Sequence, residues 1–277
     1  MTTDASGSAP AVRLDRARGV LRAVLDRPER RNAIDADLLA GLHAAVDAAE
    51  TDPECRVLVL SATGDDFCAG TDLSDGAPEP APTPATAPAS ASGSGSASAS
   101  ATGAGSGELP YWTLLDRLTR TPVVTVALVE GRATAGGVGL AAACDLVLAG
   151  PGARFRLTEA LVGLVPAMAL PFVARRTGEQ RAFTATLLAE DLDAPAAVAA
   201  GLADAVAEQP GHALRRTLVA LSRLDRSTAG ALKEYRARLF PRDADLGRDA
   251  GRTFLDRLAD PAVHRLLGRI TAPERAA

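Results

Sequence analysis

The sequence predicts an α/β protein with parallel strands and a helical C-terminal region. Apolar strand patterns alternate with helical patterns as far as about residue 207, and this alternation is typical of parallel strands that are joined by helices. Residues 211–270 are mostly helical and charged on one side. The chain has 277 residues, of which 47% are hydrophobic and only 3% aromatic, so a full core would be built mainly from Ala, Leu and Val.

The first elements are a hairpin, a helix and a strand. Residues 12–26 alternate in polarity and contain one Arg-Gly break, which indicates two antiparallel strands. Asp35 is a suitable N-cap for a helix over about 36–50, because apolar residues recur there on one helical face. Residues 56–61 (RVLVLS) predict a short strand.

The same rhythm returns further along the chain. Residues 109–119 predict a helix and residues 123–129 (VVTVALV) a strand. A glycine turn, a helix of small residues and a strand at 145–149 follow. The pattern from about 159 to 188 is helical, and a short strand is expected near 203–207. Breaks in the helical pattern are expected at Pro166 and Gly178.

Between these two parts the composition changes sharply. Residues 76–107 are almost wholly Ala, Ser, Gly, Pro and Thr, and Glu79 is their only charged residue. Such a segment buries too little apolar surface to offset the entropy of ordering it. We therefore predict a core over 11–210 that contains a disordered insertion at 76–107, followed by a helical oligomerisation region at 211–270.

Composition and charge argue against several classes of function. The formal net charge is −4 and no basic block occurs, so no nucleic-acid partner is expected. Three widely spaced cysteines predict neither a disulfide framework nor a metal site. The sequence contains no apolar run of about eighteen residues and no recognisable signal peptide, so we expect a cytoplasmic protein without a membrane partner.

Two glycine turns follow predicted strands. Ala69-Gly70-Thr71 comes after the strand at 56–61, and Ala135-Gly136-Gly137 comes after the strand at 123–129. Such turns expose backbone N–H groups, and small side chains let a ligand atom approach them closely. Two N–H groups that converge on one oxygen form an oxyanion hole. Taken alone, either turn is more often a matter of tight packing.

Four segments, in order, resemble the crotonase superfamily, which has the enoyl-CoA hydratase/isomerase fold. They are LDRPERRNAID (25–35), FCAGTDL (67–73), the run from Glu130 to Asp145, and ARFRLTEALVGLVP (153–166). The resemblance implies a crotonase-like spiral of ββα units with a helical C-terminal region, assembled as a homo-trimer or hexamer. It also implies a thioester substrate, carried on CoA or on the phosphopantetheine arm of an acyl carrier protein, and no further cofactor.

The resemblance also implies which residues form the site. The N–H groups of Thr71 and Gly136 match the two oxyanion-hole donors, which hold the thioester carbonyl while an enolate forms. No metal ligands are implied. The remaining residues expected to contact the substrate are Ala69, Gly70, Asp72, Gly137 and Pro166.

Hydratases of this superfamily use two glutamates, and the chain retains one of them. Glu159 matches one position and is the candidate catalytic acid–base group, whereas Gly139 stands at the other. One carboxylate could still remove an α-proton or return a proton to a leaving hydroxyl group. Without the resemblance, Glu159 would be read as a solvated glutamate at a helix start. Asp72 could assist it, or could simply cap the local turn.

A narrower resemblance concerns the reaction. The pattern Pro-Ala-x-x-Leu-Pro-Phe-x-x-Arg-Arg at 166–176, Gly139 and Tyr111-Trp112 are similar to the hydratase-like dehydratases of polyketide β-branching cassettes. This implies removal of water from 3-hydroxy-3-methylglutaryl-acyl carrier protein, which gives 3-methylglutaconyl-acyl carrier protein. Two alternatives stay open: an enoyl-CoA hydratase or isomerase that acts on free CoA esters, and a non-catalytic scaffold that binds acyl-carrier domains.

Overall fold

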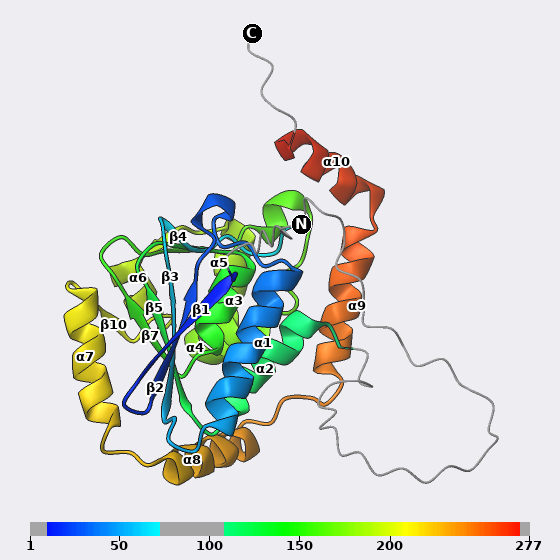
Figure 1. Ribbon diagram of the computed structural model, residues 1–277. Helices are drawn as coiled ribbons and strands as arrows, with labels where there is room; N and C mark the ends of the chain where they lie inside the picture. Colours follow the sequence, from blue (N-terminus) through cyan, green and yellow to red (C-terminus); the bar gives the residue numbers. More distant parts are fainter. Residues whose placement is uncertain (1–9, 73–107, 272–277) are drawn as a thin grey trace, which may run out of the picture.

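The structure is a computed structural model that describes residues 10–72 and 108–271 (Figure 1). The insertion expected at 76–107 lies outside the described residues. None of the helices in the described ranges is long and apolar enough to cross a membrane.

Two β-sheets form the centre of the fold. The larger has six strands in the order β1-β2-β3-β5-β7-β10, and the smaller has four in the order β4-β6-β8-β9. Neighbouring strands are parallel except for β1 with β2 and β8 with β9. The strands are β1 (Val12–Ala17), β2 (Val20–Leu25), β3 (Val57–Ala62), β4 (Asp66–Cys68), β5 (Val124–Val129), β6 (Arg132–Thr134), β7 (Leu146–Ala149), β8 (Arg154–Arg156), β9 (Leu192–Asp193) and β10 (Ala205–Val206).

The repeating unit is two strands followed by a helix. β3 and β4 precede α2 (Pro110–Arg120), β5 and β6 precede α3 (Gly136–Ala143), and β7 and β8 precede α4 (Leu170–Thr177). In each unit the first strand joins the six-stranded sheet and the second joins the four-stranded sheet. The chain therefore winds through successive ββα units, and the predicted α/β class with parallel strands is confirmed.

The inner strands of the six-stranded sheet are buried on both faces, whereas the edge strand β1 is mostly exposed. Alternate strand residues point to opposite faces: Leu58 and Leu60 belong to the large core cluster that includes α1 (Ala36–Thr51), α2 and α3. Val57 and Val59 belong to a second cluster, which includes residues of α7 (Pro210–Leu221) and α8 (Arg226–Leu239). Figure 1 shows α1 and α7 on opposite sides of this sheet.

The first predicted elements are confirmed. The hairpin at 12–26 is formed by β1 and β2. The Asp35 side chain caps α1 by accepting a hydrogen bond from the Leu38 N–H at 2.9 Å. The apolar positions of α1 face the core because they recur at helical spacing.

The helical pattern expected from about 159 is wrong at its beginning. Glu159–Val162 form only one 3₁₀ turn, which ends at Gly163 with a φ of 78°. A left-handed glycine and then Pro166 stop the helix from continuing. Helix α4 begins only at Leu170, and α5 (Glu179–Leu188) follows the predicted break at Gly178. The short helix α6 (Ala194–Ala199) was not expected.

The C-terminal region is helical, and its last two helices pack against elements around the candidate active-site cavity. Helix α9 (Leu246–Leu258) packs against α2, and α10 (Pro261–Thr271) packs against the 3₁₀ turn that contains Glu159. Helix α8 is tied to α1 by the Arg226 guanidinium, which donates hydrogen bonds to carbonyl groups at the C-terminal end of α1 and just beyond it. Whether this region also serves oligomerisation stays a prediction.

Candidate active site

The two glycine turns of the sequence lie against each other. They follow β4 and β6, which are neighbouring parallel strands. A Cβ on residue 137 would lie 2.2 Å from the Cys68 carbonyl oxygen, and a Cβ on residue 70 would lie 3.1 Å from the Gly136 nitrogen. Glycine at both positions lets the two backbone segments approach this closely at the N-terminus of α3.

The geometry at Thr71 directs its N–H group away from the neighbouring strand. Thr71 forms an isolated parallel bridge with Ile34. In this bridge the Ile34 N–H donates to the Gly70 carbonyl at 2.8 Å, and the Ile34 carbonyl accepts from the Asp72 N–H at 3.0 Å. Because the bridge uses the groups before and after Thr71, the Thr71 N–H points to the opposite side.

The second predicted donor is the N–H group of the first residue of α3. Gly136 begins this helix, and N–H groups of a first helical turn have no partner within the helix. The preceding Ala135 has a φ of 51° and a ψ of −121°, a conformation that essentially only glycine adopts without strain. Strain of this kind persists where the surrounding structure fixes the backbone, which is common at ligand sites.

A cavity of about 190 Å³ opens beside these N–H groups. Of the predicted site residues, Ala69, Thr71, Gly136, Glu159 and Pro166 line it, whereas Gly70, Asp72 and Gly137 do not. Gly70 and Gly137 instead allow the close backbone contacts described above. Thr158, Val162, Leu164, Met168 and Ala169 also line the cavity and lie within the segments already noted at 153–166 and 166–176. Phe254 and Leu267 had no local sequence signal, because α9 and α10 supply them from distant parts of the chain.

Glu159 is the carboxylic acid of this cavity. Its Oε2 atom is buried and has no hydrogen-bond partner within the described part of the chain. Burial raises the pKa of Glu159 from 4.5 to about 7, and the backbone N–H groups of Glu159 and Thr158 offset only part of the rise. Near neutral pH such a group can both accept and donate a proton.

Asp72 is placed differently from Glu159. Its carboxylate forms an ion pair with Arg30 at 2.7 Å, and the residue is absent from the cavity lining. This arrangement does not support the predicted role of Asp72 as a helper of Glu159. In residues 10–72 and 108–271, no group of three or more His, Cys, Asp or Glu side chains could hold a metal ion.

Position 139, where a second glutamate would be expected, has no room for a side chain. A Cβ there would lie 2.6 Å from the Tyr111 hydroxyl oxygen and 2.7 Å from the Ala169 Cβ. The Tyr111 hydroxyl donates a hydrogen bond to the Gly136 carbonyl oxygen. Burial raises the pKa of Tyr111 well above its usual value, and the Cys68 and Glu159 side chains add to the rise. A neutral phenol therefore occupies the space of the missing carboxylate.

Comparison with known proteins shows the family of the chain. The sequence profile of the family described as Enoyl-CoA hydratase/isomerase matches residues 15–239. The chain belongs to this family. Bacillaene synthase dehydratase PksH of Bacillus subtilis is 31% identical over 213 residues, which make up 77% of this chain and 75% of that protein. The 1,2-epoxyphenylacetyl-CoA isomerase of Escherichia coli is 30% identical over 181 residues, which make up 64% of this chain and 62% of the isomerase.

Solved structures of the family share the fold. A polyketide biosynthesis enoyl-CoA hydratase (PksH) from Bacillus subtilis has a TM-score of 0.78 at 26% identity, with 95% of this chain and 98% of that chain covered. An enoyl-CoA hydratase from Mycobacterium avium has a TM-score of 0.74 at 25% identity, with 95% and 97% covered. The expected crotonase-like fold is confirmed, and the protein is an enzyme of the hydro-lyase type, which adds or removes water.

Replacing Glu159 should change the pH dependence of stability. Because the folded-state pKa of about 7 lies above 4.5, the wild type loses stability as the pH rises between these values. The loss amounts to about 3 kcal/mol. The glutamine of Glu159→Gln cannot ionise, so this variant should not show the loss. The difference in free energy of unfolding, variant minus wild type, should therefore rise by about 3 kcal/mol from about pH 4 to about pH 8.5. Urea unfolding at both pH values measures this. The exposed control Glu208→Gln should show no such difference; an equal response of the two variants would contradict the burial of Glu159.

Adding a side chain at position 139 should strain the site. We expect Gly139→Ala to lower the free energy of unfolding by about 1–3 kcal/mol, because overpacking of a full core has this cost. Gly211→Ala is a matched control, since its Cβ would meet no atom closer than 4.0 Å. Thermal and urea unfolding compare the two variants. The double variant Gly139→Ala/Tyr111→Phe should recover part of the loss, and full tolerance of Gly139→Ala alone would show that the space is open.

Proposed function

We propose that this enzyme removes water from a 3-hydroxy-3-methylglutaryl group held as a thioester on an acyl carrier protein. The product is the 3-methylglutaconyl thioester. The observation that carries the proposal is the pairing of one desolvated carboxyl group, Glu159, with a position 139 that is closed to a second. The relative PksH, named a bacillaene synthase dehydratase, supports the same direction of reaction.

In this proposal the thioester carbonyl oxygen accepts hydrogen bonds from the Thr71 and Gly136 N–H groups. Each of these hydrogen bonds becomes stronger as negative charge develops on that oxygen. One donor of an oxyanion hole typically contributes about 2.7–4 kcal/mol to transition-state stabilisation. The polarised carbonyl makes the proton on C2 acidic enough for a carboxylate to remove.

Glu159 then handles both protons of the elimination. Its carboxylate takes the C2 proton, and the electron pair of that C–H bond forms the enolate. When the enolate collapses, the C2–C3 double bond forms and the C3–O bond breaks. The same carboxylic acid returns its proton to the departing hydroxide, so the products are water and a regenerated carboxylate. One group on one face of the substrate gives syn elimination.

The chemistry requires no cofactor beyond the carrier of the thioester. The carrier is an acyl carrier protein in the proposed function and CoA in the alternative function of an enoyl-CoA hydratase or isomerase. The cavity, at about 190 Å³, is smaller than the about 300–1,000 Å³ of ordinary ligand pockets, which suits a short acyl group.

Intact-mass analysis tests the reaction directly. Acyl carrier protein loaded with a 3-hydroxy-3-methylglutaryl group should lose the mass of one water when incubated with the wild type. Glu159→Gln should abolish the loss, because the amide can neither accept nor return the proton. Asp72→Asn should retain activity, since Asp72 lies outside the cavity lining.

The other outcomes favour the alternatives. Equal rates on the free CoA ester and on the carrier-bound group would favour an enoyl-CoA hydratase or isomerase. Absence of turnover on either substrate, with unchanged binding of the carrier domain by Glu159→Gln, would favour a non-catalytic scaffold.

We also infer a homo-oligomer, either a trimer or a hexamer. Leu232, Tyr235 and Leu239 are 58%, 55% and 53% exposed and recur on one side of α8, where they form an uncovered apolar strip. Leu232→Glu/Tyr235→Glu should reduce the mass measured by light scattering after size exclusion, whereas the exposed control Arg223→Glu should leave it unchanged. A wild type that is monomeric at micromolar concentration would contradict the inference.

A further inference from the structure

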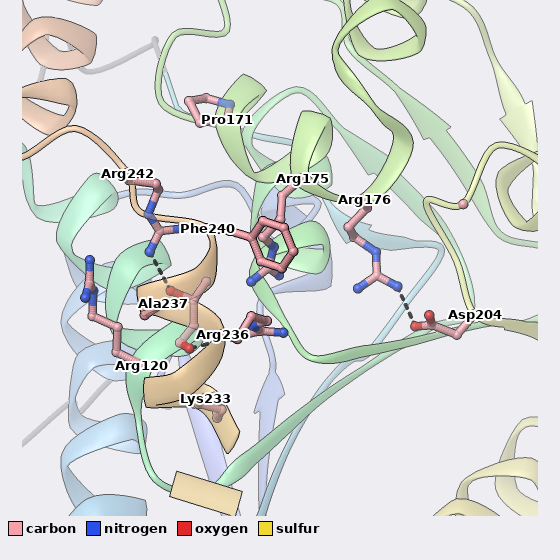
Figure 2. A pocket seen from close by; sticks show the side chains of 12 residues that line it. Arg120, Pro171, Arg175, Arg176, Asp204, Lys233, Arg236, Ala237, Phe240 and Arg242 are labelled. Atoms are coloured by element: carbon pink, nitrogen blue, oxygen red, sulfur yellow. Dashed lines mark hydrogen bonds and ion pairs between the residues drawn. The ribbon is translucent and has the colours of Figure 1, made fainter. Parts of the chain in front are cut away.

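A second and larger cavity, of about 540 Å³, lies at the other end of α3 from the active site. Helix α3 has eight residues, so its two ends are about 12 Å apart. Figure 2 shows Arg175 and Arg176 extending from α4, while Lys233, Arg236, Phe240 and Arg242 come from α8 and the segment after it. The remaining lining residues are Thr119, Arg120, Pro171, Gly201, Asp204 and Ala237.

The lining of this cavity is strongly basic. It contains six cationic side chains, namely Arg120, Arg175, Arg176, Lys233, Arg236 and Arg242, and Asp204 is its only carboxylate. Asp145 and Asp116, which stand behind the lining, also form ion pairs with these cations. Three carboxylates therefore face six cations, and this part of the structure keeps an excess of positive charge.

Two of the cations already use all or nearly all of their hydrogen-bond donors. The Lys233 ammonium group donates to the Leu118 and Val123 carbonyls and to the Asp145 carboxylate. These three hydrogen bonds use all three of its N–H donors. Arg176 donates from Nε and both Nη atoms, to carbonyl groups and to Asp204. These two side chains hold the walls of the cavity and have little capacity left for a ligand.

Three arginines keep unused donors. In Arg175, Arg236 and Arg242 only the Nη2 atom takes part in hydrogen bonds with the described residues. Arg175 uses it to bind the Ala142, Ala143 and Cys144 carbonyls at the C-terminus of α3, and no carboxylate forms an ion pair with it in the described part of the chain. The Nε and Nη1 donors of the three side chains remain for a ligand.

The charges also repel one another. Burial, together with the nearby charges of Arg236, Arg176 and Arg242, lowers the pKa of Arg175 to about 10 even though Asp145 acts in the opposite direction. The folded protein thus disfavours the positive charge that Arg175 carries at neutral pH. An anion in the cavity would relieve both the repulsion and the loss of hydration.

We propose that this cavity is a binding site for a phosphoryl group, distinct from the active site. Two N–H donors of a guanidinium group can bind two oxygens of a phosphate at once. The three guanidinium groups of Arg175, Arg236 and Arg242 offer more donors and more positive charge than one carboxylate, with two oxygens and a single charge, can satisfy. A phosphate dianion offers more acceptors and the second charge. The exposed Phe240 ring at the cavity supplies an apolar surface for the organic part of a phosphate ester.

Binding is tested on the full-length protein with sodium phosphate and with phenyl phosphate, each compared with sodium chloride at equal ionic strength. Phosphate should raise the melting temperature in a saturable manner, since a ligand that binds only the folded state stabilises it by mass action. Arg236→Gln and Arg242→Gln should weaken the affinity roughly ten- to a hundredfold, as expected for loss of one charge-assisted hydrogen bond. Arg252→Gln, an exposed arginine of α9 outside the cavity, should not change it.

A charge-preserving variant guards against a folding defect. Arg236→Lys keeps the positive charge but loses the planar pair of donors, so it should fold like the wild type and still bind phosphate more weakly. Tighter binding of phenyl phosphate than of inorganic phosphate would identify an ester as the ligand, and equal binding would identify the free ion.

Three results would overturn the proposal. The first is a shift in melting temperature no larger than that produced by sodium chloride. The second is equal phosphate affinity in the wild type and in Arg236→Gln. The third is an oligomer that dissociates in Arg236→Gln without any phosphate binding by the wild type, because the cavity would then hold an acidic side chain of a second copy.

Discussion

The carbonyl oxygen of Cys68 lies where a Cβ of residue 137 would otherwise stand, and the geometry of the active site depends on this contact. It requires glycine at the start of α3, next to the parallel strands β4 and β6, and Thr71 and Gly136 then line the same cavity. The residues of α3 are all buried and mostly small, because larger side chains would separate the helix from the turns around it. The absence of bulky side chains around α3 therefore allows the close backbone packing that fixes the positions of the Thr71 and Gly136 N–H groups.

Both ends of α3 are held by groups from elsewhere in the chain. At the N-terminus the Tyr111 hydroxyl donates to the Gly136 carbonyl, and at the C-terminus Arg175 donates to the last carbonyl groups. A cation at the C-terminal end of a helix is favoured by the helix dipole. The two contacts fix the helix along its axis. For the proposed reaction this matters because an oxyanion hole contributes only when its donors are already in place before charge develops.

Local patterns in the sequence were sufficient for most elements and for the two turns. Helix α1 follows from the spacing of its apolar residues and from the Asp35 cap, and Glu159 follows from a family motif. The division of the strands into two sheets was not predictable, because each ββα unit sends neighbouring strands to different sheets. Nor were Phe254 and Leu267 in the cavity lining, or the basic cavity, since both depend on helices that are distant in the sequence. The 3₁₀ turn at Glu159 was mistaken for a helix because its apolar spacing continues past Gly163.

The loss of one glutamate changes what the remaining one must do. With two carboxylates, one can act as the base and the other as the acid, and their pKa values can lie far apart. In the proposed elimination the single carboxyl group is ionised when it takes the C2 proton and protonated when it releases water, so a pKa near neutrality would serve both steps. The apolar lining around Glu159 raises its pKa to about 7, into that range. The Tyr111 hydroxyl fills the space of the second carboxylate without adding a charge. The folded state bears the cost of a buried carboxyl group that lacks a hydrogen bond at Oε2.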